Sequence, residues 1–141
     1  MVQIDVRYEG GLRCSAVHAP SGAKLLTDAP LDNHGKGQSF SPTDLLATSL
    51  ATCILTTMAI VAERHGWDLT GATVSVEKSM VADPLRRVAK LDVKVRVPGV
   101  TDPRARATLE RTAATCPVHE SLSSVLDAPV AFEWGPAGVP S

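Results

Sequence analysis

Residues 41–66 read SPTDLLATSLATCILTTMAIVAERHG, and this stretch decides the fold. Ser41 is a suitable helix N-cap, and Pro42 suits the first turn, where its missing N–H costs nothing. Asp44 lies where a carboxylate meets exposed backbone amides. Because the residues that follow are apolar nearly all round, other elements must wrap this helix. We therefore expect a central core helix that starts at Ser41.

The helix is expected to end at about His65, with Gly66 as its C-cap. Residues 45–62 form a stretch of 18 residues without a charge, and a stretch of this length has to be considered as a membrane span. Five of these residues are hydroxylic and four are alanine, which leaves too few large apolar side chains for insertion. We expect a buried helix and no membrane partner. The start of the chain, MVQIDVRYEG, lacks the basic and apolar run of a signal peptide, which favours a cytoplasmic location.

Alternating polar and apolar residues predict strands on both sides of this helix. Before the helix, strands are expected at 3–8, 12–18 and 24–27, the first two joined as a hairpin through Glu9-Gly10-Gly11. Residues 28–41 predict a long ordered loop. After the helix come, in order, a hairpin of 73–80 with 91–97, a helix at 103–115, helical spacing from Val118 to Leu126, a strand at 129–134 and a tail at 135–141. This order predicts one α+β domain over residues 1–141.

The apolar side of the 103–115 helix is expected to consist of Ala107, Leu109, Ala113 and Ala114.

The whole chain has 14 basic and 15 acidic residues, so its formal net charge is −1. The aromatic residues are two Trp, two Phe and one Tyr. We therefore expect no nucleic-acid partner, because neither a basic surface nor a stacking platform is present.

Three cysteines, an odd number spread along the chain, do not form a secreted disulfide framework. Cys53 lies midway along the apolar helix, where a cysteine is often only a small core side chain. Cys116, in the sequence CPVH, is expected to cap a new helical turn, whose amides favour a thiolate. It could equally be an ordinary cap. Cys14 is expected to serve packing alone.

Other kinds of site are poorly supported by the sequence. His119 follows Cys116 by three residues, and Cys53 is a conceivable third ligand, but no Cys-x-x-Cys motif accompanies them. His18, His34 and His65 lack ligand spacing. No Gly-x-Ser-x-Gly or phosphate-binding glycine loop is present. We expect neither a metal nor a cofactor. The remaining alternatives are thiol chemistry or no chemistry at all.

Taken together, SPTDLLATSLATC with Cys53 and the later CPVH resemble the OsmC/Ohr family of osmotically inducible and organic hydroperoxide resistance proteins. LRCSAVHAPSGAKLLTDAP, VEKSM and the terminal FEW extend the resemblance over nearly the whole chain. The resemblance implies an OsmC-like α+β fold in which two chains intertwine as a homodimer, with sheets around central helices and two active sites at the subunit interface. It also implies a peroxidatic Cys53 and a resolving Cys116.

The same resemblance implies a cation beside the peroxidatic thiolate, because burial alone disfavours a charged sulfur. The family uses an arginine from the N-terminal strands, often oriented by a carboxylate, and Arg13 best fits that role. Peroxidases of the family carry Pro-Glu at the helix start, whereas this chain has Pro42-Thr43 and places its acid at Asp44. One position is a rotation of about 100° along a helix, so Asp44 need not meet the arginine.

The function expected from the resemblance is that of a thiol peroxidase in an antioxidant stress response. It would reduce organic hydroperoxides to alcohols through a Cys53 sulfenic acid and a Cys53–Cys116 disulfide, which an external dithiol would reopen. The alternative is a non-catalytic dimer of the same fold that binds a small lipophilic or thiol-reactive ligand. A Cys/His metal protein is a third class.

Overall fold

A computed structural model describes residues 1–135, so the expected tail lies, apart from Gly135, outside the described residues. The chain divides into two compact units, called here unit 1, residues 1–46, and unit 2, which starts at Ala47. Each unit is described by itself. The expectation of a single domain over residues 1–141 stays a prediction.

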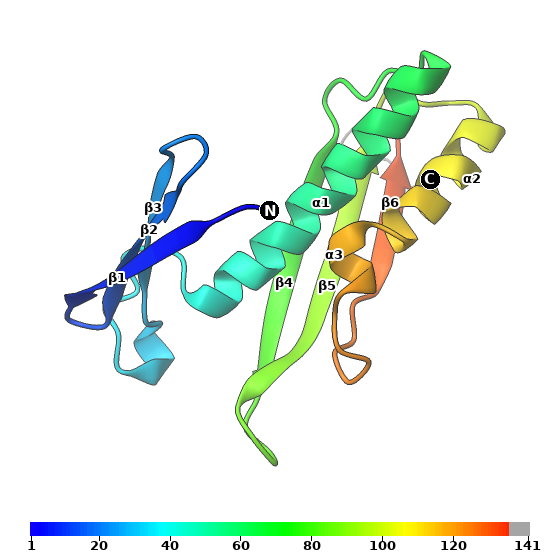
Figure 1. Ribbon diagram of the computed structural model, residues 1–141. Helices are drawn as coiled ribbons and strands as arrows, with labels where there is room; N and C mark the ends of the chain where they lie inside the picture. The colour runs from blue at the N-terminus through cyan, green and yellow to red at the C-terminus, as the bar shows by residue number, and fades with distance from the viewer. Residues whose placement is uncertain (136–141) are drawn as a thin grey trace. The chain divides into compact units, whose positions relative to one another are not determined.

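Unit 1 is built on a three-stranded antiparallel sheet in the order β1-β2-β3 (Figure 1). The strands are β1 (Ile4–Gly10), β2 (Arg13–His18) and β3 (Lys24–Asp28). The expected hairpin is confirmed, and Gly10 and Gly11 both take positive φ angles in its turn. The loop after β3 contains one short 3-10 helix, η1 (Leu31–Asn33).

The expected central helix is confirmed as α1 (Pro42–His65). At its start the backbone N–H of Ser41 donates to Asp44 Oδ2 at 2.9 Å, while Asp44 N donates to Ser41 Oγ at 3.1 Å. These reciprocal bonds form a capping box. The helix ends at Gly66, whose φ of 71° is the left-handed conformation that glycine adopts readily. Local capping chemistry therefore fixes both ends of α1.

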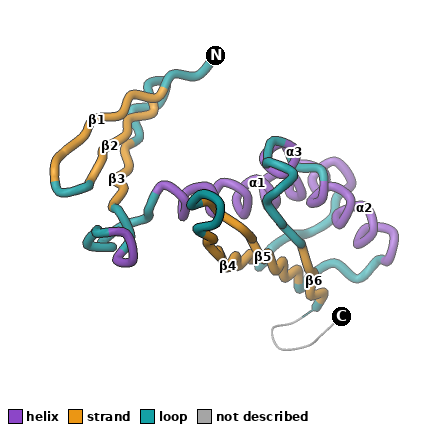
Figure 2. The backbone as a smooth tube through the Cα atoms, turned by 90° about the horizontal axis from the view of Figure 1, so that it is seen from below, coloured by secondary structure: helices purple, strands orange, loops and turns teal. Residues whose placement is uncertain are grey.

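Unit 2 contains a second three-stranded sheet in the order β4-β5-β6. Its strands are β4 (Thr73–Val81), β5 (Arg87–Val97) and β6 (Val130–Trp134). The expected β4–β5 hairpin is confirmed, and β6 adds to the other edge of β5 in parallel. The helices α1 and α2 (Pro103–Ala114) lie on the same side of this sheet (Figure 2). A mixed α+β fold with two sheets and one long apolar helix is the class that the sequence predicts.

The core of unit 2 lies between this sheet and the two helices. On β5 the inward positions are buried and the positions between them are more exposed, as expected for a sheet with one wet face. On α1 one residue in every three or four is buried, which marks one stripe rather than the whole circumference. The buried apolar side chains of α1 and β5 are Ala47, Leu50, Ile54, Met58, Ala62, Val88, Leu91, Val93, Val95 and Val97.

Two expectations for the second half of the chain are wrong. The buried side of α2 is formed by Ala105, Leu109 and Ala113, whereas Ala107 and Ala114 are exposed. Residues four apart share a helical stripe, but Ala107 is turned about 200° from Leu109, so both cannot face the sheet.

The helical spacing expected up to Leu126 also fails, because α3 (Pro117–Glu120) is a single turn. Serine side chains bind the backbone in and after this turn: Ser121 Oγ donates to Pro117 O at 2.7 Å, and Ser123 Oγ accepts from Val125 N at 3.4 Å. Such local bonds compete with helix continuation. The chain instead returns through turns to β6.

Candidate active site

Cys53 lies midway along α1, one residue before the fully buried Ile54, and is itself only half-buried. Its Sγ lies 3.8 Å from Thr57 Oγ1, one helical turn further on. Thr57 Oγ1 also donates to the Cys53 carbonyl oxygen at 2.6 Å. The Cys53 thiol is thus at the border of the core and remains partly accessible, as an attacking sulfur must be.

Cys116 is fully buried and is the N-cap of α3, as its sequence context predicts. Its Sγ accepts a hydrogen bond from the backbone N–H of His119 at 3.4 Å. The amides of this cap favour a thiolate, as expected, but burial outweighs them. Burial raises the pKa of Cys116 above its ordinary value of 9.0, and the hydrogen bonds from the His119 and Val118 amides only partly oppose that rise.

The two thiols interact with one another, although 62 residues separate them in the sequence. Burial has the largest effect on the Cys116 pKa, and the hydrogen bond from the His119 amide has the second largest. The Cys53 side chain comes third, and it raises the Cys116 pKa further. Both cysteines are free thiols. Unit 2 therefore places a half-buried thiol beside a fully buried one that keeps its proton at neutral pH.

His119 lies on α3 beside Cys116, and its ring Nε2 is 3.2 Å from the carbonyl oxygen of Ala128. Because a carbonyl oxygen only accepts, this ring nitrogen carries the proton. Cavities of about 410 Å³ and about 310 Å³ share His119 and Ala128 in their linings. Among residues 1–135, no three His, Cys, Asp or Glu side chains gather closely enough to hold a metal ion.

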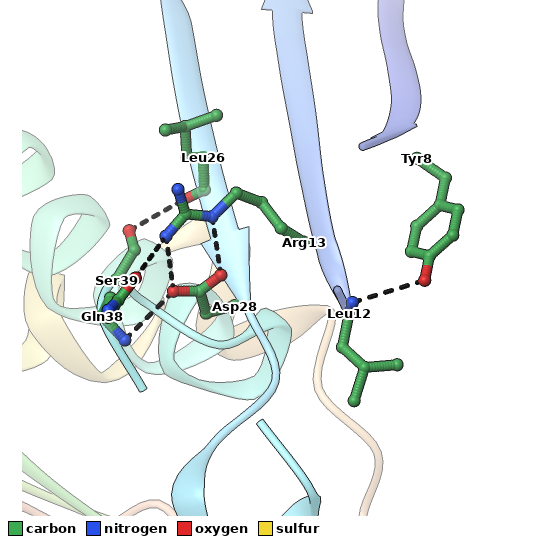
Figure 3. Close-up of polar contacts among 7 residues, drawn as sticks. All are labelled: Tyr8, Leu12, Arg13, Leu26, Asp28, Gln38 and Ser39. Atoms are coloured by element: carbon green, nitrogen blue, oxygen red, sulfur yellow. Dashed lines mark hydrogen bonds and ion pairs between the residues drawn. The ribbon is translucent and has the colours of Figure 1, made fainter. Parts of the chain in front are cut away.

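Arg13, the cation expected from the resemblance, is at the start of β2 in unit 1 and faces Asp28 at the end of β3 (Figure 3). Its Nε donates to Asp28 Oδ1 at 2.8 Å and its Nη2 to Asp28 Oδ2 at 2.9 Å. Gln38 closes the group: its side-chain oxygen accepts from Arg13 Nη2 at 3.2 Å, and its backbone N–H donates to Asp28 Oδ2 at 3.0 Å. A bidentate pair of this kind fixes the plane of the guanidinium.

The ion pair shifts the ionisation of both its members. The hydrogen bonds from Arg13 hold the pKa of Asp28 below its ordinary value of 3.8, against the opposing effect of burial. The same bonds with Asp28 raise the pKa of Arg13. Asp28 is almost wholly buried, whereas about a third of the Arg13 side chain is exposed. Arg13 and Asp28 are therefore both charged at neutral pH, and part of the Arg13 side chain remains accessible to solvent.

The remaining sequence candidates have simpler surroundings. Asp44 closes the capping box with Ser41. Cys14 is half-buried on β2, opposite Tyr8 and Thr27 in the sheet register.

Sequence reasoning missed Asp28 and Gln38. The strand expected at 24–27 stops one residue short and assigns Asp28 to the loop. A strand extended by one residue, in the observed register with β2, would have put Asp28 opposite Arg13. The available signal was thus the pairing of opposite charges across a hairpin.

The sequence and the fold match a known class of protein. The family model described as OsmC-like protein matches residues 35–128, which is most of the chain. The chain therefore belongs to the OsmC-like family, as its sequence motifs indicate. A comparison with curated protein sequences gave no match.

Solved structures of similar fold include a candidate osmotic stress induced and detoxification response protein from Psychrobacter arcticus. It is 43% identical, with a TM-score of 0.89 over 94% of this chain and 96% of that chain. An organic hydroperoxide resistance protein OsmC from Legionella pneumophila is 17% identical, with a TM-score of 0.76 over 94% and 96%. A candidate organic hydroperoxide resistance protein from Vibrio cholerae, with captopril in one of its active sites, is 17% identical, with a TM-score of 0.73 over 92% and 90%. The last two likenesses concern the fold alone.

Proposed function

We propose that this protein is a thiol peroxidase that reduces organic hydroperoxides, with Cys53 as the peroxidatic and Cys116 as the resolving cysteine. The observation that carries the proposal is that the half-buried Cys53 thiol lies near enough to the fully buried Cys116 to raise the Cys116 pKa. Two thiols of unequal exposure, brought together from distant parts of the chain, suit a two-step reaction in which one is oxidised and the other closes a disulfide.

In the first step the Cys53 thiolate attacks the outer oxygen of a hydroperoxide, ROOH. An S–O bond forms, the O–O bond breaks, and the alkoxide takes up a proton and leaves as the alcohol ROH. Cys53 is thereby oxidised to the sulfenic acid. The family resemblance and the largely apolar helix α1 that carries Cys53 favour a peroxide with a carbon chain over hydrogen peroxide.

In the second step the Cys116 sulfur attacks the Cys53 sulfenic acid. An S–S bond forms, the S–O bond breaks, and the hydroxyl group leaves as water with the thiol proton of Cys116. The raised pKa of Cys116 suits this role, because a neutral thiol does not compete with Cys53 for the peroxide. An external dithiol then reduces the disulfide by exchange and is itself oxidised.

The proposal assigns to Arg13 the role of the cation that stabilises the thiolate. Its support is the family resemblance, together with the planar, permanently charged guanidinium that Asp28 and Gln38 hold in place in unit 1. In this chain Asp28 supplies the carboxylate that orients the arginine. Asp44 then stabilises the start of α1 through its capping box.

We further propose that the active species is the intertwined homodimer that the resemblance implies. Unit 1 has 46 residues and a three-stranded sheet, too small to bury an apolar core of its own. Large apolar side chains of this sheet and of its first hairpin turn are exposed to solvent, and a second chain would cover them: Ile4, Val6, Tyr8, Leu12, Leu25 and Leu26. The cytoplasmic location and the role in oxidative stress stay predictions.

Stopped-flow kinetics test the proposal. Reduced protein is mixed with cumene hydroperoxide or hydrogen peroxide, with dithiothreitol as the dithiol, and the products are identified by mass spectrometry. We expect turnover with both peroxides and faster oxidation by the organic one. Absence of peroxide consumption by the wild-type dimer would contradict the proposal and favour a ligand-binding protein of the same fold.

A further inference from the structure

The position of His119 points to a role in disulfide closure that neither the motif nor the family assigns here. His119 is bound at two points: its backbone N–H donates to Cys116 Sγ at 3.4 Å, and its ring Nε2–H donates to Ala128 O at 3.2 Å. One residue therefore joins the sulfur of Cys116 to the segment that leads into β6.

That segment is itself fixed to the central strand of the sheet. Asp127 N donates to Ala89 O at 3.0 Å, and Leu91 N donates to Asp127 O at 2.8 Å. Just beyond Ala128, Val93 N donates to Pro129 O at 3.0 Å. The carbonyl that receives the His119 ring is thus held by ladder-like bonds on both sides. Through His119, the single turn of α3 is fastened to β5.

The His119 ring is held by its hydrogen bond more than by packing. The side chain is half-buried, and the cavities of about 410 Å³ and about 310 Å³ both border it. A ring with empty space beside it has few packed neighbours to keep it in place. The bond to Ala128 O therefore controls how firmly the turn that carries Cys116 is positioned.

We propose that His119 is a positioning residue that keeps the Cys116 sulfur directed at Cys53 and so favours their disulfide. This rests on the proposed pairing of the two cysteines. His119 supplies no electrons and takes up no proton in this role, since its Nε2–H donates to Ala128 O in both the neutral and the cationic ring. A side-chain amide that reaches the same carbonyl should therefore replace it.

The test is the equilibrium of the full-length dimer with glutathione buffers, in which one glutathione disulfide and the protein dithiol give the protein disulfide and two glutathione thiols. The Cys53–Cys116 disulfide is quantified by thiol blocking and peptide mapping. Loss of one hydrogen bond is expected to lower the equilibrium constant about three- to tenfold in His119→Ala. In His119→Gln the constant should stay within about twofold of wild type.

Ser121→Ala is the matched control, because Ser121 Oγ donates to Pro117 O within the same turn without joining it to the sheet. It should leave the constant within about twofold of wild type. An unchanged constant in His119→Ala, an equal loss in Ser121→Ala, or a Gln variant as poor as the Ala variant would overturn the inference. If His119→Ala does not fold, the Gln variant decides, and a lowered constant there would overturn it.

The peroxidase proposal and the positioning role of His119 can be tested independently of each other. Peroxide consumption by the wild-type protein tests the peroxidase activity, whereas the glutathione equilibrium needs no peroxide. A wild-type protein that ignores peroxides but forms the disulfide in glutathione buffers, with the expected order of variants, would support the positioning role alone. A wild-type protein that forms no Cys53–Cys116 disulfide in these buffers would overturn it.

Discussion

The buried Cys116 of unit 2 and the buried Asp28 of unit 1 have pKa values that are shifted in opposite directions. In unit 2, Cys116 is fully buried, and burial raises its pKa above the ordinary value. In unit 1, the equally buried Asp28 meets the Arg13 guanidinium, and its pKa falls below the ordinary value. Burial alone therefore does not decide the charge of a group. The presence of a cation does, and the proposed mechanism needs both a neutral resolving thiol and a fixed cation.

The largest expected effect separates the two cysteines. Cys53→Ser should abolish peroxide turnover, a loss of roughly a thousandfold or more, because it removes the attacking sulfur. Cys116→Ser should still consume one equivalent of peroxide and stop at the sulfenic acid or its overoxidised products. Single-turnover stopped-flow kinetics with mass spectrometry measures both. Equal single-turnover rates in Cys53→Ser and wild type would eliminate Cys53 as the nucleophile.

A smaller effect is expected at the ion pair of unit 1. Arg13→Ala should slow the oxidation of Cys53 by about tenfold, the usual effect of removing a cation from a thiolate. Arg7→Ala is the matched control, because it removes the same charge from an exposed position on the neighbouring strand β1. The measurement is the second-order rate constant for the oxidation of Cys53 by a hydroperoxide in each variant. If the two variants oxidise equally fast, another cation activates the thiol.

The raised pKa of Cys116 predicts a loss of stability in alkali. In the unfolded chain the thiol ionises near the ordinary value of 9.0, whereas in the folded chain it keeps its proton to higher pH. Its contribution to the free energy of unfolding is complete below pH 9.0 and declines as the pH rises through the folded pKa. Thermal unfolding of the reduced protein from pH 7.5 to 10.5 measures the decline. Cys116→Ser should flatten it, and an identical decline in that variant would assign the effect to other groups.

The smallest effect is expected at Asp44. Asp44→Ala removes the acceptor of the Ser41 N–H and a carboxylate from the first turn of α1, which should cost about 0.5–1 kcal/mol of unfolding free energy. Peroxide turnover should change by less than about twofold, because the proposal gives Asp44 a capping role alone. Urea unfolding and steady-state kinetics are the two measurements. A large loss of turnover with stability intact would instead place Asp44 in the active site.

The sequence predicts what depends on neighbours along the chain. Ser41 and Gly66 mark both ends of α1, and alternation reveals the β4–β5 hairpin, since caps and strand periodicity are local. Other features depend on distant contacts. The side of α2 that faces the sheet, the register that puts Arg13 opposite Asp28, and the burial that outweighs the amide bonds to Cys116 all arise from tertiary packing. The family resemblance supplied the pairing of Cys53 with Cys116, which no local pattern contains.

The most direct test of the central claim is to treat the reduced protein with one equivalent of cumene hydroperoxide and map its disulfides. We expect one intramolecular disulfide bond between Cys53 and Cys116, with Cys14 left as a free thiol. A disulfide that contains Cys14, or complete recovery of all three free thiols after addition of the peroxide, would contradict the proposed roles of Cys53 and Cys116.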